Sequence, residues 1–435
     1  MKNADILIHG CTILPMNRKR SIENGALAVK DGRIAFVGKN ASAGRIVAEA
    51  KIDAKGKVAL PGLINCHTHV PMTVFRGIAD DKPLNVWLEK TIWPLEARLK
   101  PEDVYNGALL GCLEMIEGGT TCFADMYFHE DEVAKAVEKS GLRGVLGEGV
   151  IEAGSSVQGE KMLARSVSFA ERFRDYADGR VSAMLAPHAV YSCSLELLLK
   201  VGEKASQLGV GLHLHVGESE TMLREFEKKN RLSEVEFLDK IGLLNEQVLA
   251  AHCINLSEKD MRTLSNRKVN AAYVPVANMK LGLSAAKVKD LTSLGVNVGL
   301  GTDGPASNNS LDLFETMKTG ALLQKHEYLD PTVLPAYEVL KMATLNGARA
   351  VGLEKDVGSL EVGKKADIIL VDLAKPHLTP LHDIYSTIVY SARAADVETV
   401  IVDGKILMQN QQARSLDEQA VMEKARKTAY DLLSR

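Results

Sequence analysis

The sequence predicts an α/β fold, a (β/α)8 TIM-like barrel joined to a small composite β-sandwich. Eight short apolar segments recur between residues 58 and 301, as expected of parallel strands that are buried on both faces. Helical segments separate them, and regular alternation of strands and helices favours a barrel. The length of 435 residues suits one such barrel with a smaller second unit.

Residues 1–58 are predicted to form the first part of the β-sandwich. The β-like segments are short and closely spaced, at residues 5–8, 13–14, 25–29 and 33–37. Asp31-Gly32 separates the last two, and this dipeptide is typical of a tight hairpin turn. Short strands without a helix of normal length between them are typical of a small sandwich.

Residues 59–355 are predicted to form the barrel. Its eight expected strands are 58–66, 121–126, 144–150, 181–187, 210–216, 248–253, 269–274 and 296–301. Helices are expected between them at 101–117, 130–139, 160–176, 195–208 and 219–226. An open, doubly wound sheet is the alternative, but no glycine-rich phosphate loop follows the first strand.

A long insertion separates the first barrel strand from its helix. It runs from Asp80 to Leu99 and holds both tryptophans of the chain, Trp87 and Trp93. Long insertions with aromatic residues often form a lid or a wall of a substrate site. Packing against the barrel rim, or contact with another subunit, is the alternative.

Residues 356–435 return to short strands and end in a helix. Strands are expected within 358–371 and 397–408, the second forming a hairpin around Asp403-Gly404, and an amphipathic helix over 417–435. Chain termini often meet at a surface. We therefore expect this segment and residues 1–58 to build one composite β-domain.

Charge and composition exclude several classes of function. The net charge is −3 and no basic block is present, which argues against binding nucleic acid through its phosphates. No apolar run is long enough to span a bilayer. The N-terminus lacks a signal-peptide core, and the six cysteines form no Cys-x-x-Cys pair. A cytoplasmic chain with reduced thiols is therefore expected.

Histidines gather at the ends of the predicted strands. Six of the eleven do so, namely His67, His69, His188, His213, His215 and His252. Side chains two residues apart on a strand point the same way, so His67 and His69 can bind one ion together. The carboxyl ends of barrel strands form the active-site face, and the last strand ends there in Asp303.

These residues predict a catalytic metal site, which needs protein ligands and an open position for water. His67, His69, Asp303 and one of His213 and His215 would supply three imidazoles and a carboxylate. Spacing alone leaves both histidines of the fifth strand as candidates, with His213 favoured as a packed, hydrogen-bonded barrel residue. One divalent ion is expected, with zinc favoured over iron.

Such a site points to hydrolytic chemistry, since a bound metal lowers the pKa of water. Asp303 can accept the proton of the water, and Glu218 can protonate a ring nitrogen of the electrophile. His252, expected opposite the metal, suits a polarising or proton-shuttling role. His188 is equally consistent with an ordinary histidine at the rim of the barrel.

Four motifs together resemble the amidohydrolase superfamily, and within it the 5′-methylthioadenosine/S-adenosylhomocysteine deaminase family, including its 5′-deoxyadenosine deaminase type. They are PGLINCHTH (61–69), HLHVGE (213–218), AAHC (250–253) and GTDGPASNNS (301–310). The resemblance implies a metal-dependent hydrolase barrel that converts adenosine-type nucleosides to inosine analogues and ammonia. It also implies a homo-oligomer, a dimer or tetramer.

Carried over residue by residue, the resemblance assigns the site as follows. It makes His67, His69, His215 and Asp303 the metal ligands, Glu218 the acid/base at the purine ring, His252 the group that orients water, Glu96 the acceptor of ribose hydroxyls, and His188 a substrate contact.

One position departs from the family. Some relatives have an arginine near the end of the third strand, where it can meet the homocysteine carboxylate, whereas this chain has Glu148 nearby. A glutamate there would repel a carboxylate, so we expect a preference for uncharged 5′ groups. The alternatives are another deaminase or a chlorohydrolase of the superfamily, acting on guanine, cytosine or a triazine, and a barrel relative without catalysis.

Overall fold

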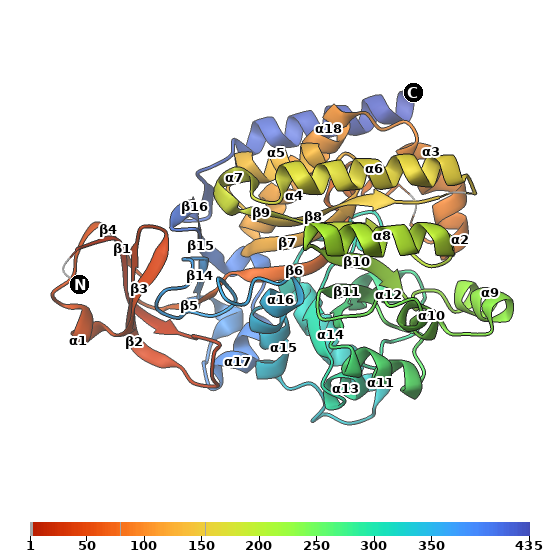
Figure 1. Cartoon of the computed structure of the whole chain (residues 1–435). Helices are drawn as coiled ribbons and strands as arrows, with labels where there is room; N and C mark the ends of the chain where they lie inside the picture. Colours follow the sequence, from red (N-terminus) through yellow and green to blue (C-terminus); the bar gives the residue numbers. More distant parts are fainter. Residues whose placement is uncertain (1–2, 79, 153) are drawn as a thin grey trace.

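The computed structural model describes residues 3–78, 80–152 and 154–435. Its larger part is an eight-stranded parallel barrel, in which the strands follow one another in chain order (Figure 1). The strands are β6 (Leu63–Thr68), β7 (Thr120–Tyr127), β8 (Arg143–Val150), β9 (Val181–Pro187), β10 (Gly211–Val216), β11 (Val248–His252), β12 (Asn270–Tyr273) and β13 (Asn297–Leu300). The predicted (β/α)8 fold is confirmed.

The first and last strands meet and nearly close the barrel. Just beyond β13, the N–H of Asp303 donates a hydrogen bond to the carbonyl of His67 at 2.9 Å. The side chain of Asn65 donates to the hydroxyl of Thr302 at 2.8 Å. The ends of β6 and β13 therefore lie side by side.

Helices surround the barrel strands, as the apolar strand pattern requires. They are α4 (Pro101–Glu117), α5 (Glu130–Ser140), α6 (Ser156–Phe173), α7 (Tyr176–Gly179), α8 (Leu195–Leu208), α9 (Glu220–Asn230), α10 (Glu234–Lys240), α11 (Glu258–Asn266), α12 (Pro275–Lys280), α13 (Val288–Ser293), α14 (Leu313–Glu327), α15 (Ala336–Met342) and α16 (Leu345–Ala350). The helix bounds predicted for α4 and α8 are confirmed. Helix α6 begins four residues before its prediction because the Ser155 hydroxyl caps it by accepting from the N–H of Gln158.

Both chain ends contribute strands to one mixed sheet beside the barrel (Figure 1). Its strands are β1 (Asn3–Ile13), β2 (Ile22–Lys30), β3 (Arg33–Lys39), β4 (Val47–Asp53), β5 (Lys57–Pro61), β14 (Ile368–Asp372), β15 (Val397–Val402), β16 (Lys405–Gln409) and β17 (Gln412–Ala413), with a short helix α1 (Asn40–Ala43). Antiparallel pairing of β5 with β14 joins the two contributions, as expected of a composite β-domain.

The first expected barrel strand, 58–66, is in fact two strands of different sheets. Strand β5 belongs to the mixed sheet and β6 to the barrel, and Gly62 lies between them. A Cβ at Gly62 would lie 2.0 Å from the Thr121 hydroxyl oxygen, so only glycine fits where the chain passes between the sheets. The break is not evident from the sequence because the segments that form β5 and β6 are equally apolar.

The remaining helices follow the mixed-sheet strands or precede α4. After β14 the chain forms α17 (Ile384–Ser386) and, at its end, α18 (Glu418–Ser434). Helix α18 lies along α4 (Figure 1), where Asn106 donates to the Thr428 hydroxyl at 3.0 Å. No helix among the described residues is long and apolar enough to cross a membrane.

The insertion after β6 folds into short helical turns. A 3-10 turn (Val70–Phe75) is followed by α2 (Leu84–Trp87), a π-helical turn (Leu88–Ile92) and α3 (Trp93–Glu96). The π-helical turn ends two residues before Pro94, which has no N–H to continue an α-helical ladder. The N–H of Trp93 bonds instead to the carbonyl of Leu88, five residues back.

Candidate active site

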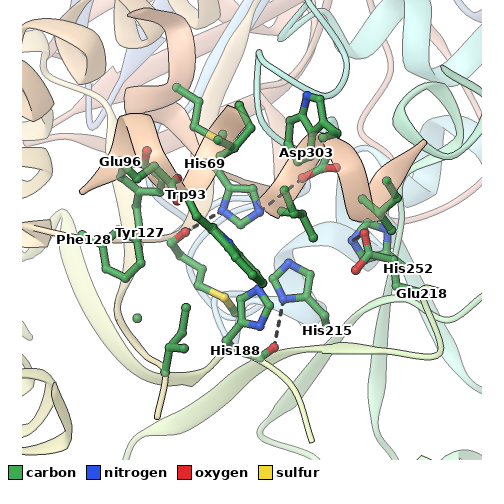
Figure 2. A pocket seen from close by; sticks show the side chains of 18 of the residues that line it. His69, Trp93, Glu96, Tyr127, Phe128, His188, His215, Glu218, His252 and Asp303 are labelled. Carbon is green, nitrogen blue, oxygen red and sulfur yellow. Dashed lines mark hydrogen bonds and ion pairs between the residues drawn. The ribbon is translucent and has the colours of Figure 1, made fainter. Parts of the chain in front are cut away.

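The carboxyl ends of the barrel strands bring His69, His188, His215 and His252 into one cavity with Asp303 (Figure 2). Nε2 of His67 lies 3.5 Å and Nε2 of His69 lies 3.3 Å from the same oxygen, Oδ1 of Asp303. His67 is fully buried, and His69 is partly buried. The two imidazoles therefore converge on one carboxylate, as their spacing predicted.

The two histidines on β10 differ in their hydrogen bonds. Nδ1 of His67 and Nε2 of His213 are 2.8 Å apart and share a hydrogen bond. His213 is thus a packed, hydrogen-bonded barrel residue behind His67. Nε2 of His67 is buried and has no hydrogen-bond partner among the described residues, which is costly unless a further group binds it.

The other two imidazoles are oriented by backbone carbonyls. Nδ1 of His69 donates to the carbonyl of Met126 at 2.6 Å, and Nδ1 of His215 donates to the carbonyl of His188 at 2.9 Å. Metal-binding histidines usually donate their second ring N–H in this way, which leaves the other nitrogen free as a ligand.

Asp303 is held in an unusual backbone conformation. Its φ of +65° lies in the left-handed region, which is costly for residues other than glycine and is often found at functional sites. The Ser307 hydroxyl donates to Oδ2 and the Gly304 N–H donates to Oδ1, both at 2.8 Å. Burial opposes ionisation, but His67 and His69 hold the pKa of this carboxyl well below its usual range.

Two overlapping sets of three residues could hold a metal ion, with their ligand atoms within 4.8 Å of one another. One set is His67, His69 and Asp303, and the other is His67, His215 and His252. These are the residue types that bind zinc and similar divalent ions. His213 is in neither set.

Glu218 and His252 face each other beside this cluster. Nε2 of His252 lies 3.7 Å from Oε1 of Glu218, and Nδ1 of His252 donates to Oδ1 of Asn278 at 3.0 Å. Burial raises the pKa of Glu218. A buried acid with a raised pKa is suited to proton transfer near neutral pH.

A cavity opens over the histidine cluster. At its histidine end lie His69, His215, His252, Glu218 and Asp303, and at its insertion end lie Leu84, Trp87, Trp93 and Glu96. Figure 2 shows Glu96 and Glu218 on opposite sides of the view, with Trp93 and His188 between them. The insertion therefore forms a wall of the cavity.

His188 and Glu96 both line the cavity, as predicted. Burial lowers the pKa of His188 to about 3, so this imidazole is neutral, and its Nδ1 shares a hydrogen bond of 3.0 Å with the Ser192 hydroxyl. Burial raises the pKa of Glu96 to about 7 against the opposing effects of Tyr127 and His69.

Several residues of the cavity were not predicted from the sequence. Tyr127, Phe128, Ile151 and Tyr191 also line it. Tyr127 is the last residue of β7, and Phe128 and Ile151 come directly after β7 and β8, so their position at the active-site face was the available signal. They give the cavity aromatic and apolar walls.

The prediction that Glu148 repels a carboxylate on the 5′ group of the substrate is wrong. This side chain is buried outside the cavity, where it accepts hydrogen bonds from the N–H groups of His129 and Glu130 at the start of α5. Its Oε1 also lies 2.8 Å from Nε of Arg165. The carboxylate is therefore already paired and cannot repel a ligand, and among the described residues that line the cavity none is a lysine or arginine.

Residues 58–407 match the amidohydrolase family. The chain belongs to this family. The amidohydrolase is 51% identical over 433 residues to a 5′-deoxyadenosine deaminase of Methanosarcina acetivorans, with 99% of each chain covered. It is 46% identical over 434 residues to a 5-methylthioadenosine/S-adenosylhomocysteine deaminase of Pelotomaculum thermopropionicum, covering 99% of this chain and all of that one.

A solved structure agrees with this membership. The amidohydrolase superposes on an adenosine deaminase from Xanthomonas campestris with bound zinc, with a TM-score of 0.96, 33% identity and complete coverage of both chains. Family membership and the histidine cluster together support a divalent metal ion in this site.

Proposed function

We propose that this amidohydrolase deaminates adenosine-type nucleosides by hydrolysis, giving inosine analogues and ammonia. The observation that carries the proposal is the single cavity that has the histidine cluster and Glu218 at one end and Glu96 at the other. A purine fits the first end, where water and proton donors are needed, and a sugar fits the second, where a carboxylate can accept hydroxyl hydrogens.

His67, His69, His215 and Asp303 would hold one divalent ion, for which we propose zinc, with iron as the alternative. The residues fit the ion because Nε2 of His67 is buried and has no hydrogen-bond partner in the described part of the chain, while the Nδ1 atoms of all three imidazoles are already bonded. When bound, the ion would supply Lewis-acid activation of the attacking water.

The remaining steps belong to side chains of the cavity. Asp303 accepts a proton from the water that adds to C6 of the purine. Glu218 gives a proton to the ring nitrogen beside C6, and its raised pKa favours the protonated form that this step needs. His252, fixed by Asn278, orients the water. The proton then passes from Asp303 to the amine, ammonia leaves as the C6–N bond breaks, and the C6 hydroxyl gives its proton back to Glu218 as the carbonyl forms.

The 5′ substituent would meet the apolar part of the cavity. Phe128, Ile151 and Tyr191 line it, and no cation among the described lining residues is available to pair with a carboxylate. We therefore propose that 5′-deoxyadenosine and 5′-methylthioadenosine are preferred to S-adenosylhomocysteine. The names of the relatives include both kinds of substrate. The proposed order of the substrates therefore rests on the residues that line the cavity.

Ammonia release from a panel of compounds tests the proposal. The purified chain is assayed with 5′-deoxyadenosine, 5′-methylthioadenosine, S-adenosylhomocysteine, adenosine, adenine and guanine, and its metal content is measured in parallel. We expect the first two to give the highest kcat/KM. Activity confined to guanine would overturn the proposed function, while a clear preference for S-adenosylhomocysteine would overturn only the ranking.

A further inference from the structure

The loop that carries Glu218 is fastened to the loop that follows His252. The carbonyl of Gly217 accepts hydrogen bonds from the backbone N–H of Asn255 at 2.9 Å and from its side-chain Nδ2 at 3.0 Å. The same Nδ2 donates to the carbonyl of Glu218 at 3.1 Å. The Asn255 side chain therefore binds the carbonyls of both peptide bonds of Glu218, the one before it and the one after it.

A second side chain, the buried Glu234, holds the same loop from another direction. Oε2 of Glu234, at the start of α10, accepts a hydrogen bond from the N–H of Gly217 at 2.6 Å. Gly217 has a φ of +63°, and a Cβ there would meet Leu256 at 3.2 Å and backbone atoms of Asn255 at 3.4 Å. The loop is thus enclosed as well as hydrogen-bonded.

These contacts connect the two side chains that face each other over the histidine cluster. Asn255 comes three residues after His252, whose ring is fixed by Asn278, and it binds the backbone of Glu218. The separation of 3.7 Å between His252 and Glu218 therefore depends on how the two loops are joined. Neither Asn255 nor Glu234 lines the cavity, so neither touches a substrate directly.

We propose that Asn255 and Glu234 are positioning residues for deamination, which hold Glu218 at its working distance from His252. The inference rests on the proposed function, because it assigns Glu218 its role as proton donor. A proton donor displaced by about 1 Å can cost about 100-fold in rate. The loss should fall on kcat, since the donor acts in the chemical step.

Asn255→Asp is the sharpest test because it keeps the size of the side chain and removes the Nδ2 donor. With 5′-deoxyadenosine as substrate we expect kcat to fall about 10- to 100-fold, with KM changed less than about threefold and the metal content unchanged. Asn255→Gln keeps the donor and should recover part of the loss. At the second position, Glu234→Gln keeps an acceptor for Gly217 and should stay near the parent, whereas Glu234→Leu should lose kcat.

Asn270→Asp is the matched control. Asn270 is more buried than Asn255, but its Nδ2 likewise donates to two backbone carbonyls, those of Glu246 and Val248 at the other end of the barrel. A parent-like kcat for Asn255→Asp, or an equal loss for Asn270→Asp, would overturn the positioning role alone. A parent chain that releases no ammonia from any nucleoside would overturn the proposed function and this inference with it.

Discussion

The histidine end of the cavity is built from strand ends, whereas its insertion end is built from short turns between β6 and α4. At the histidine end the imidazoles of His67, His69, His215 and His252 are each fixed by a hydrogen bond to another group of the barrel domain. At the insertion end Trp93 is 40% exposed, and a π-helical turn precedes it. The contrast indicates that the barrel fixes the chemistry, while the insertion adapts the cavity to the rest of the substrate.

The largest expected effect separates the two histidines of β10. His215→Ala removes a proposed ligand and should leave less than about one tenth of an equivalent of bound metal, with activity reduced at least about 1,000-fold. His213→Ala removes only the partner of His67, so metal affinity should fall about 10- to 100-fold. Metal analysis after dialysis measures both, and equal metal loss in the two variants would contradict the assignment.

Glu218→Gln tests the chemistry of the histidine end without disturbing the ligands. Loss of a general acid should reduce kcat about 100- to 10,000-fold, because the amide cannot deliver the proton. The metal content should stay that of the parent. A reduced metal content in this variant would instead make Glu218 part of the metal site.

Glu96→Gln tests the insertion end. We expect kcat/KM for 5′-deoxyadenosine to fall about 10- to 100-fold, because hydrogen bonds to a charged acceptor contribute about 1.5–3 kcal/mol. Activity on adenine, which has no sugar, should be unchanged. Equal losses on both compounds would contradict a role for Glu96 at the sugar.

The same variant has an expected effect on stability that depends on pH. The pKa of Glu96 rises from an ordinary 4.5 to about 7 in the folded chain, so the folded state holds this proton more tightly and loses stability as the pH rises through this interval. Glu96→Gln removes that loss. Its Tm should therefore exceed that of the parent by about 2–4 °C at pH 8 and match it near pH 4.5.

The smallest expected effect concerns the 5′ substituent. Ile151→Arg places a cation in the apolar part of the cavity, where it can meet the homocysteine carboxylate. A partly exposed ion pair contributes up to about 1 kcal/mol, so kcat/KM for S-adenosylhomocysteine relative to 5′-deoxyadenosine should rise about fivefold. An unchanged ratio would place the 5′ group elsewhere in the cavity.

Strand ends could be predicted from the sequence better than side-chain surroundings. Alternating apolar segments located His67, His69, His188 and Asp303, because every barrel strand ends at the same face. The same alternation gives His213 and His215 equal orientation, and only the hydrogen bond to His67, from a strand far away in sequence, separates them.

Two predictions failed, the single strand over residues 58–66 and the role of Glu148. The sequence carries only part of the information needed to avoid these errors. The break at Gly62 depends on the close approach of Thr121, which no local pattern reveals. For Glu148 a signal existed, since Gly149 and Ile151 line the cavity and alternate residues of a strand face opposite sides. That alternation places Glu148 toward the helices, where Arg165 neutralises it.

Three of the four proposed ligands lie on the seam where the barrel closes, whereas the fourth, His215, lies on β10. His67 and His69 come from its first strand and Asp303 from just beyond its last, where the Asp303 N–H bonds the His67 carbonyl. During synthesis the imidazoles of β6 leave the ribosome long before the carboxylate that completes the set. A full ligand set therefore exists only in a chain whose barrel has closed. Bound metal would then indicate that the barrel has folded completely.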